Sequence, residues 1–193
     1  MTVVYEDNHI IIVNKTASEI VQGDKTGDTP LSEMLKQYIK EAYAKPGNVF
    51  LGVTHRLDRP VSGLVVFAKT SKALSRLNDM FRNGEVKKTY WAIVKQCPPP
   101  KKASWSITWC VTKSKTSPYA YDREVKDSKK AVLHYKLIGR SENYYLVEVD
   151  LKTGRHHQIR CQLAKAGCPI KGDLKYGFPR SNLMGAFVCM HGR

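Results

Sequence analysis

Short runs of β-branched and aromatic residues, separated by turn-forming residues, dominate this sequence. Such runs are typical of β-strands, and short polar turns between them favour hairpins of antiparallel strands. In residues 85–95 the side chains alternate with the period of two that a strand requires. The runs that predict strands are residues 3–5, 9–13, 49–54, 64–68, 85–95, 131–138 and 144–151.

A few stretches have the apolar spacing of helices instead. Thr29 is expected to cap the first helix, with Pro30 in its first turn. Thr70 or Ser71 is expected to cap the second, which ends at Gly84. A third, short helix follows a glycine turn. The predicted helices are residues 31–44, 71–83 and 156–166.

The pattern of strands joined by hairpins, with a few inserted helices, predicts an α+β fold around a mostly antiparallel sheet. The 193 residues suffice for one domain with a substantial core, and no repeat or linker divides them. Two stretches look less regular. Residues 97–130 are basic and contain several aromatic side chains, and residues 168–193 are loop-rich with an apolar run at 186–190.

Positive charge is the unusual part of the composition. The chain has 32 Lys and Arg residues against 17 Asp and Glu, a formal net charge of +15. This excess favours a polyanionic partner, most often nucleic acid, because cations that neutralise phosphates release counterions. A basic protein without such a partner is the alternative. Residues 97–130 pose the same choice between an RNA contact and a solvated surface, and we favour RNA.

The sequence gives no sign of secretion or of a membrane. Residues 1–7 lack the basic and apolar regions of a signal peptide. The aliphatic stretch at residues 10–13 is too short to span a bilayer. The five cysteines are odd in number and never spaced as C-x-x-C, which argues against a disulfide framework and a structural zinc site. We therefore expect a cytoplasmic protein.

Asp58 is the first candidate for chemistry. It lies in residues 55–63 (HRLDRPVSG), between two arginines and just before a turn. Opposite charges close to a carboxylate keep it ionised, and an ionised carboxylate in a fixed position can act as a nucleophile or as a charge partner. Taken alone, this pattern is more often that of a surface ion pair beside a turn.

Two further segments contain candidate residues. Residues 87–91 (KKTYW) place Tyr90 in a predicted strand behind two lysines. Residues 151–160 (LKTGRHHQIR) predict a strand end, a glycine turn and a helix. On that helix His157 and Arg160 share one face, and Ile159 lies on another that can pack inward. Arg160 is therefore expected at the edge of the core, where a guanidinium can form a bidentate bond to a buried carboxylate.

Together these segments resemble the motifs of the RluA-type pseudouridine synthases. The resemblance runs in order from about Val3 to Arg193, so it covers nearly the whole chain. The residues that carry it are 55–58 (HRLD), 62–64 (SGL), 88–90 (KTY), 153–155 (TGR), 157–160 (HQIR), 172–173 (GD) and 176–177 (YG).

The resemblance implies a pseudouridine synthase-like core, in which helices and loops flank a mixed, largely antiparallel sheet. It implies an isomerase that converts specific uridines of rRNA or tRNA to pseudouridine, with no cofactor and no metal. The catalytic residues would be Asp58, Tyr90 and Arg160. Asp58 would attack the ribose or the base or assist glycosidic-bond cleavage, Tyr90 would stack on the uracil, and Arg160 would pair with Asp58.

RNA binding by such an enzyme has a physical cost. A uridine inside a helix must be flipped out before a carboxylate can reach it, at a cost of a few kcal/mol. Stacking on an aromatic side chain recovers roughly 1–3 kcal/mol per base. Nearby cations would hold the phosphates of the flipped nucleotide. The residues expected to bind substrate are His55, Arg56, Arg59, Arg155, His157 and Ile159.

The chain also departs from the family pattern. Residues 16–18 (TAS) follow Asn14-Lys15 where relatives commonly have Pro-Ala-Gly, which predicts a less rigid loop. Val61 stands where threonine is usual and should keep the shape of the loop. We expect residues 1–193 to form a single catalytic domain, monomeric, without the N-terminal S4-type domain of many relatives and with a short C-terminal edge.

Two other functions fit part of the sequence. A non-catalytic RNA-binding or RNA-chaperone protein with a synthase-like fold explains the charge and aromatics equally well. It has no need, however, for an ionised carboxylate in a phosphate-binding cleft. A metal-dependent nuclease would need clustered carboxylates that the sequence lacks, and the adjacent His156 and His157 diverge on a helix. Neither G-x-S-x-G nor a phosphate-binding loop motif occurs.

Overall fold

The structure of the chain is a computed structural model, which describes residues 1–98, 102–110, 119–126, 128–181 and 188–191. For residues 102–110 and 188–191 it describes the backbone only. The chain divides into two compact units, Met1–Val86 (unit 1) and Lys87–Arg193 (unit 2). The described part contains antiparallel strands and three α-helices, so the predicted α+β class is confirmed.

Unit 1 is built on antiparallel strands. β1 (Thr2–Glu6) pairs with β2 (Ile10–Lys15), β2 pairs with β4 (Gly63–Ala68), and the short β3 (Gly52–Val53) pairs with the end of β4. Ile11 lies opposite Phe67 and Val13 opposite Val65, and all four are fully buried. Period-two burial thus sets this register, because a slip by one residue would expose the set. The strand predicted at residues 49–54 shrinks to the two residues of β3.

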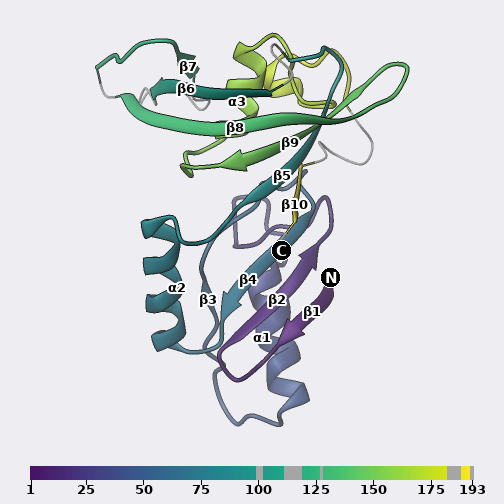
Figure 1. Cartoon of the computed structure of the whole chain (residues 1–193). Helices are drawn as coiled ribbons and strands as arrows, with labels where there is room; N and C mark the ends of the chain where they lie inside the picture. The colour runs from purple at the N-terminus through teal and green to yellow at the C-terminus, as the bar shows by residue number, and fades with distance from the viewer. Residues whose placement is uncertain (99–101, 111–118, 127, 182–187, 192–193) are drawn as a thin grey trace. The chain divides into compact units, whose positions relative to one another are not determined.

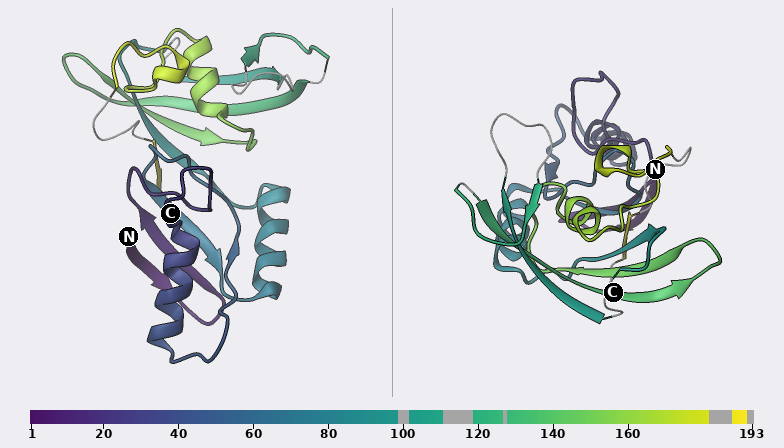
Figure 2. Two further views of the ribbon diagram at one scale, coloured as in Figure 1. Left: turned by 180° about the vertical axis from the view of Figure 1, so that it is seen from behind. Right: turned by 90° about the horizontal axis from the view of Figure 1, so that it is seen from above.

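α1 (Leu31–Ala42) lies along one face of this sheet, as Figures 1 and 2 show. Its buried stripe includes Leu31, Leu35 and Ile39, which recur every four residues as an amphipathic helix requires. The prediction that Thr29 caps this helix is wrong, because Pro30 is the N-cap residue and no side chain accepts there. The first two helical N–H groups donate instead to backbone carbonyls of residues 20 and 21, at 2.8 and 3.2 Å.

α2 (Ser71–Asn83) follows β4 and contacts β3 and β4. The Thr70 hydroxyl accepts a hydrogen bond from the backbone N–H of Ala73, and Gly84 ends the helix with a left-handed φ of 75°. Both predicted ends are confirmed. They were predictable because a side-chain cap and a glycine stop are local signals.

Unit 2 contains a second set of antiparallel strands, in the order β10-β5-β9-β8-β6-β7 (Figure 1). The predicted hairpin of residues 131–138 and 144–151 is confirmed as β8 and β9. The strands are β5 (Thr89–Val94), β6 (Lys102–Cys110), β7 (Tyr119–Tyr121), β8 (Ser128–Arg140), β9 (Tyr145–Leu151) and β10 (Val188–His191).

Residues 97–130, expected to be less regular than the rest, contain strands over part of their described length. β6 pairs with β8 from Lys102↔Lys136 to Cys110↔Ser128. The sequence of β6, KASWSITWC, alternates small or polar residues with larger apolar ones, and this period indicates a strand. Lys101, Lys113 and Lys115, on which the expected RNA contact partly rests, lie outside the described residues, and so do residues 186 and 187 of the apolar run.

α3 (Gln158–Lys165) and the short 3₁₀ helix η1 (Leu174–Tyr176) complete unit 2. Two buried glutamines of α3 donate to backbone carbonyls of β8: Gln158 to Val132 and Gln162 to Ala131, both at 3.1 Å. These bonds fix the helix against the sheet, because buried amides are costly without partners. The N-terminal part of the predicted helix, residues 156 and 157, is instead a turn.

Within the described ranges, every helix is too short or too polar to cross a membrane.

We expect Leu133→Ala to lower the free energy of unfolding by about 2–5 kcal/mol, because Leu133 is fully buried in β8 and its loss leaves a cavity. Ile138→Ala in the same strand should cost about 1 kcal/mol at most, because Ile138 is 39% exposed. Urea unfolding followed by circular dichroism measures both. Equal losses would contradict this assignment of the two faces of β8.

Candidate active site

Asp58 lies in the loop between β3 and β4 of unit 1, and it is half-buried. Its backbone carbonyl accepts a hydrogen bond from Val61 N at 3.0 Å, which closes a tight turn. The side chains of Leu57 and Val61, on either side of this turn, are buried at 8% and 6% exposure. The loop is therefore anchored by packing and by its own turn.

Lys15 is a fully buried lysine at the end of β2 and beneath this loop. Its Nζ donates to the backbone carbonyls of Thr16, Arg59 and Val61 at 3.0, 3.1 and 2.5 Å. Burial lowers the pKa of Lys15 to about 8, while the carboxylates of Glu19 and Asp58 act to raise it. Lys15 thus ties the backbone on both sides of the turn to β2 and places a cation near the Asp58 carboxylate.

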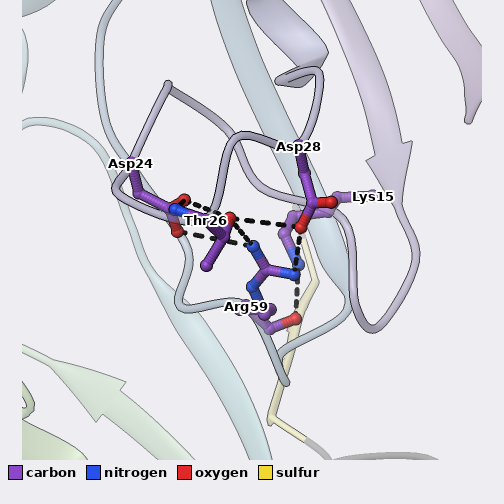
Figure 3. Close-up of polar contacts among 5 residues, drawn as sticks. All are labelled: Lys15, Asp24, Thr26, Asp28 and Arg59. Carbon is purple, nitrogen blue, oxygen red and sulfur yellow. Dashed lines mark hydrogen bonds and ion pairs between the residues drawn. The ribbon is translucent and has the colours of Figure 1, made fainter.

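Arg59 is held by the loop of residues 16–30, as Figure 3 shows. Its guanidinium contacts Asp28 at 2.7 Å and Asp24 at 3.4 Å, and it donates to the Thr26 hydroxyl at 2.6 Å. The hydrogen bond to Asp28 raises the pKa of Arg59, and the same bond lowers the pKa of Asp28. The contact with two carboxylates indicates that Arg59 links the Asp58 loop to the loop of residues 16–30. Phosphate binding by Arg59 stays a prediction.

Ser18 marks the point where this chain departs from the family pattern. Its φ is 76°, in the left-handed region that non-glycine residues rarely adopt. Its backbone N–H donates to the Arg59 carbonyl at 2.9 Å. The position therefore demands the backbone of a glycine, and this chain holds a serine there through contact with the Asp58 loop.

His55 and Arg56 precede Asp58 in the same loop. His55 Nε2 accepts a hydrogen bond from the backbone N–H of Val66 at 3.1 Å, and its ring centroid lies 5.0 Å from that of Phe81. This gives His55 a structural contact that the sequence did not predict. Arg56 is exposed and makes no hydrogen bond or ion pair within the described part of the chain, so its charge faces solvent.

Tyr90 lies in β5 of unit 2, opposite Val149 of β9 and Met190 of β10, and is half-buried. Lys88, directly before this strand, is also partly buried. Burial lowers the pKa of Lys88, and the nearby carboxylate of Asp150 acts to raise it. The predicted strand around Tyr90 is confirmed, and its role stays a prediction.

Arg160 on α3 forms a bidentate ion pair with Asp173. Its Nε donates to Oδ2 at 2.7 Å and its Nη2 donates to Oδ1 at 2.9 Å. The two side chains are 14% and 2% exposed. The expected bidentate bond to a buried carboxylate is therefore present, with a partner that the sequence analysis did not name. The pairing of Arg160 with Asp58 stays a prediction.

His157 adds a second hold on the same guanidinium. Arg160 Nη1 lies 2.9 Å from His157 Nε2, and His157 Nδ1 lies 2.9 Å from the Tyr176 hydroxyl. Arginine can only donate, so Nε2 must accept, and the neutral ring then carries its proton on Nδ1 and donates to Tyr176. His157 has a left-handed φ of 52°, and the Arg160 guanidinium carbon lies 5.1 Å from the centroid of the Tyr176 ring.

The turn before α3 is fixed by buried polar contacts. Gln158 Oε1 accepts from the Thr153 hydroxyl at 2.8 Å and from the Arg155 backbone N–H at 3.0 Å. The Arg155 side chain is exposed, and its Nε donates to the Lys130 carbonyl at 3.2 Å. Ile159 is buried at 7% exposure and packs in the core of unit 2. Substrate binding by Arg155 and Ile159 stays a prediction.

No metal ligands can be named in the described residues, because no three His, Cys, Asp or Glu side chains gather there as a metal site requires. Unit 1 holds a half-buried carboxylate close to a buried ammonium, and such a carboxylate suits nucleophilic or electrostatic chemistry. Unit 2 holds a guanidinium in a fixed plane and a strand aromatic, and an aromatic ring suits stacking on a flat ligand.

Asp173 and Tyr176 are the residues whose contacts the sequence analysis missed. Both belong to the motif segments GD and YG that carried the resemblance. A signal for their importance was therefore present, although nothing in the sequence paired them with Arg160 and His157. The contacts of Lys15 were missed as well, because its three carbonyl partners come from two separate segments.

The fold is that of solved pseudouridine synthase domains. Human RNA pseudouridylate synthase domain containing 4 matches with a TM-score of 0.77 and 25% identity, over 91% of this chain and 68% of that one. Human RNA pseudouridylate synthase domain containing 1 matches with a TM-score of 0.78 over 98% of this chain and 76% of that one, at 17% identity.

The sequence profile of the RNA pseudouridylate synthase family matches residues 9–165. The chain belongs to this family, as the RluA-type resemblance predicted. Ribosomal large subunit pseudouridine synthase C of Rickettsia bellii is 33% identical over 190 residues, 97% of this chain and 60% of that protein. Uncharacterized RNA pseudouridine synthase YhcT of Bacillus subtilis is 33% identical over 179 residues, 92% of this chain and 58% of that protein. The chain thus spans less than two thirds of these relatives.

We expect the stability of the wild type to rise relative to that of a Lys15→Met variant as the pH increases from about 8 to about 10.5. The pKa of Lys15 is lowered from 10.5 to about 8 in the folded chain. Between these values the unfolded chain still binds the proton that the folded chain has released, so the linkage term favours folding. Urea unfolding of both proteins at several pH values measures this difference, and parallel pH curves would contradict it.

Proposed function

We propose that this chain is the catalytic part of an RNA pseudouridine synthase that isomerises specific uridines in structured rRNA or tRNA. The observation that carries the proposal is the family match over residues 9–165, which includes Asp58. The bracing of the Asp58 loop by Lys15 supports it, because a reacting carboxylate must be held in position. Such substrates also agree with the expected cytoplasmic location.

Asp58 is the proposed catalytic carboxylate. The isomerisation breaks the N1–C1′ bond of the uridine and forms a C5–C1′ bond, while N1 gains a proton and C5 loses one. Atoms and electrons balance without an external reactant, so the reaction itself calls for no cofactor. Asp58 attacks the ribose or the base or assists bond cleavage, Tyr90 stacks on the uracil, and Arg160 pairs with Asp58 and orients it.

The cations of the chain supply the RNA affinity in this proposal. A net charge of +15 attracts a polyanion, and exposed arginines hold the phosphates on either side of the flipped nucleotide. Arg56 is the strongest candidate, because its exposed charge is not used within the described part of the chain. Arg155 and His157 are further candidates, and the bracing contacts of Arg59 give it an indirect part.

A non-catalytic RNA-binding protein is the second candidate. Charge and aromatic residues support it equally well. A binding module, however, gains nothing from a carboxylate that repels phosphates at the centre of its binding surface. The presence of Asp58, with a buried lysine beside it, therefore favours the isomerase.

We expect Asp58→Ala to reduce pseudouridine formation below about one thousandth of the wild-type rate, because the reacting carboxylate is removed. The assay is incubation with uridine-containing rRNA and tRNA transcripts, followed by nucleoside analysis. Asp79→Ala, which removes an exposed carboxylate of α2, is the matched control and should keep full activity. Undiminished product from Asp58→Ala, or no product from the wild type on any RNA, would overturn the proposal.

We expect Tyr90→Leu to weaken RNA binding by roughly 1–3 kcal/mol, because an aromatic platform for the flipped base is lost. Tyr90→Phe keeps the platform and should bind RNA as the wild type does. Fluorescence anisotropy with a labelled RNA measures both affinities. Equal weakening by Leu and Phe would show that the hydroxyl, and not the ring, makes the contact.

A further inference from the structure

The Arg160 guanidinium is held at three of its nitrogen atoms. Nε and Nη2 donate to the two oxygens of Asp173, and Nη1 donates to His157 Nε2. Three donors directed at two separate residues fix both the plane and the rotation of the group. An arginine that served only as a flexible phosphate contact would need no such restraint.

Asp173 is itself held in place. It precedes η1, and its backbone carbonyl accepts from the N–H groups of Tyr176 and Phe178 at 3.2 and 3.0 Å. Its own N–H donates to the Ile170 carbonyl at 3.0 Å. Phe178 is buried at 8% exposure and anchors the end of this segment. The carboxylate is therefore a rigid acceptor that lies in a protected position beside α3.

Tyr176 restrains the same group through His157. The His157 Nδ1–H group donates to the Tyr176 hydroxyl, which orients the ring so that Nε2 accepts from Arg160. The Tyr176 ring also lies 5.1 Å from the guanidinium carbon, within reach of a cation–π contact. Asp173 and Tyr176 thus restrain one arginine from the two ends of η1.

We propose that Asp173 is a positioning residue for the reaction. Tyr176 supports the same position of Arg160 indirectly, through its hydrogen bond to His157. Asp173 sets the orientation in which Arg160 acts. This inference rests on the proposed function for its effect on rate. The hold of Asp173 on Arg160 is a separate, directly measurable part of it.

The kinetic test compares Asp173→Asn with the wild type under single-turnover conditions at saturating RNA. Asn keeps the shape of the side chain but places an amide donor against an arginine donor. We expect the rate to fall about 10- to 100-fold, with RNA affinity unchanged within about 3-fold, because misplacement of a reacting group affects the chemical step. Asp122→Asn, which removes an exposed ion-pair partner of Lys165 on the same helix, is the control and should keep the wild-type rate.

A double-mutant cycle with Arg160→Lys separates positioning from a merely structural role. If Asp173 acts through Arg160, Asp173→Asn should lower the rate of the Arg160→Lys variant by less than about 3-fold. Multiplying losses, or a full rate for Asp173→Asn alone, would overturn the proposal. If Asp173→Asn fails to fold, Tyr176→Phe, which removes a single oxygen, takes its place in the same cycle with Arg160→Lys. We expect Tyr176→Phe to lower the reaction rate about 3- to 10-fold in the wild-type background and to have no such effect in the Arg160→Lys background.

Nuclear magnetic resonance tests the hold itself without any activity. We expect the Arg160 Nε–H signal to be protected from solvent exchange in the wild type and to lose this protection in Asp173→Asn. Unchanged protection would overturn the inference even in an active enzyme. A wild type that is inactive on every RNA would overturn the proposed function, while the exchange measurement would still decide whether Asp173 holds Arg160.

Discussion

The buried ammonium of Lys15 is the interaction on which the Asp58 loop depends. Three backbone carbonyls, from residues 16, 59 and 61, accept hydrogen bonds from its nitrogen. Buried carbonyls and a buried charge are each costly alone, and they satisfy one another here. Lys15 therefore links the end of β2 to the backbone of the Asp58 loop. Arg59 then adds a second brace from the outer side through Asp24 and Asp28.

Unit 2 also contains a buried charge that its surroundings must compensate, and there the charge is negative. Asp173 is an almost fully buried carboxylate, and the Arg160 guanidinium compensates it. Replacing either partner alone would leave an uncompensated charge, which is why such pairs are sensitive to single substitutions. Unlike Lys15, Arg160 bonds to side chains, so its contacts can be changed one at a time. The charge in unit 2 therefore fixes a side chain, whereas the charge in unit 1 fixes a backbone.

Local signals in the sequence proved sufficient for much of the fold. The cap and stop of α2 and the β8–β9 hairpin were predicted because neighbouring residues determine them. The start of α1 was predicted wrongly, since distant carbonyls satisfy its first N–H groups. Asp173 was overlooked for the same reason, because its pairing with Arg160 depends on how α3 and η1 pack. The sequence showed that Ser18 stands where relatives commonly have the glycine of Pro-Ala-Gly. It did not show that this position has a left-handed φ, which only the structure gives.

The distribution of cations around Asp58 has a consequence for RNA binding. Within unit 1, Lys15 bonds to backbone carbonyls and Arg59 forms ion pairs with two aspartates. Both cations therefore add less to the positive electrostatic field that attracts phosphates. Within the described residues of this loop, Arg56 keeps an exposed charge. Under the proposed function, phosphate attraction near Asp58 comes chiefly from Arg56 and from cations elsewhere on a strongly basic chain. Under the proposed function, one set of cations braces the Asp58 loop and another set is available for the RNA backbone, so that positioning and affinity can be altered independently.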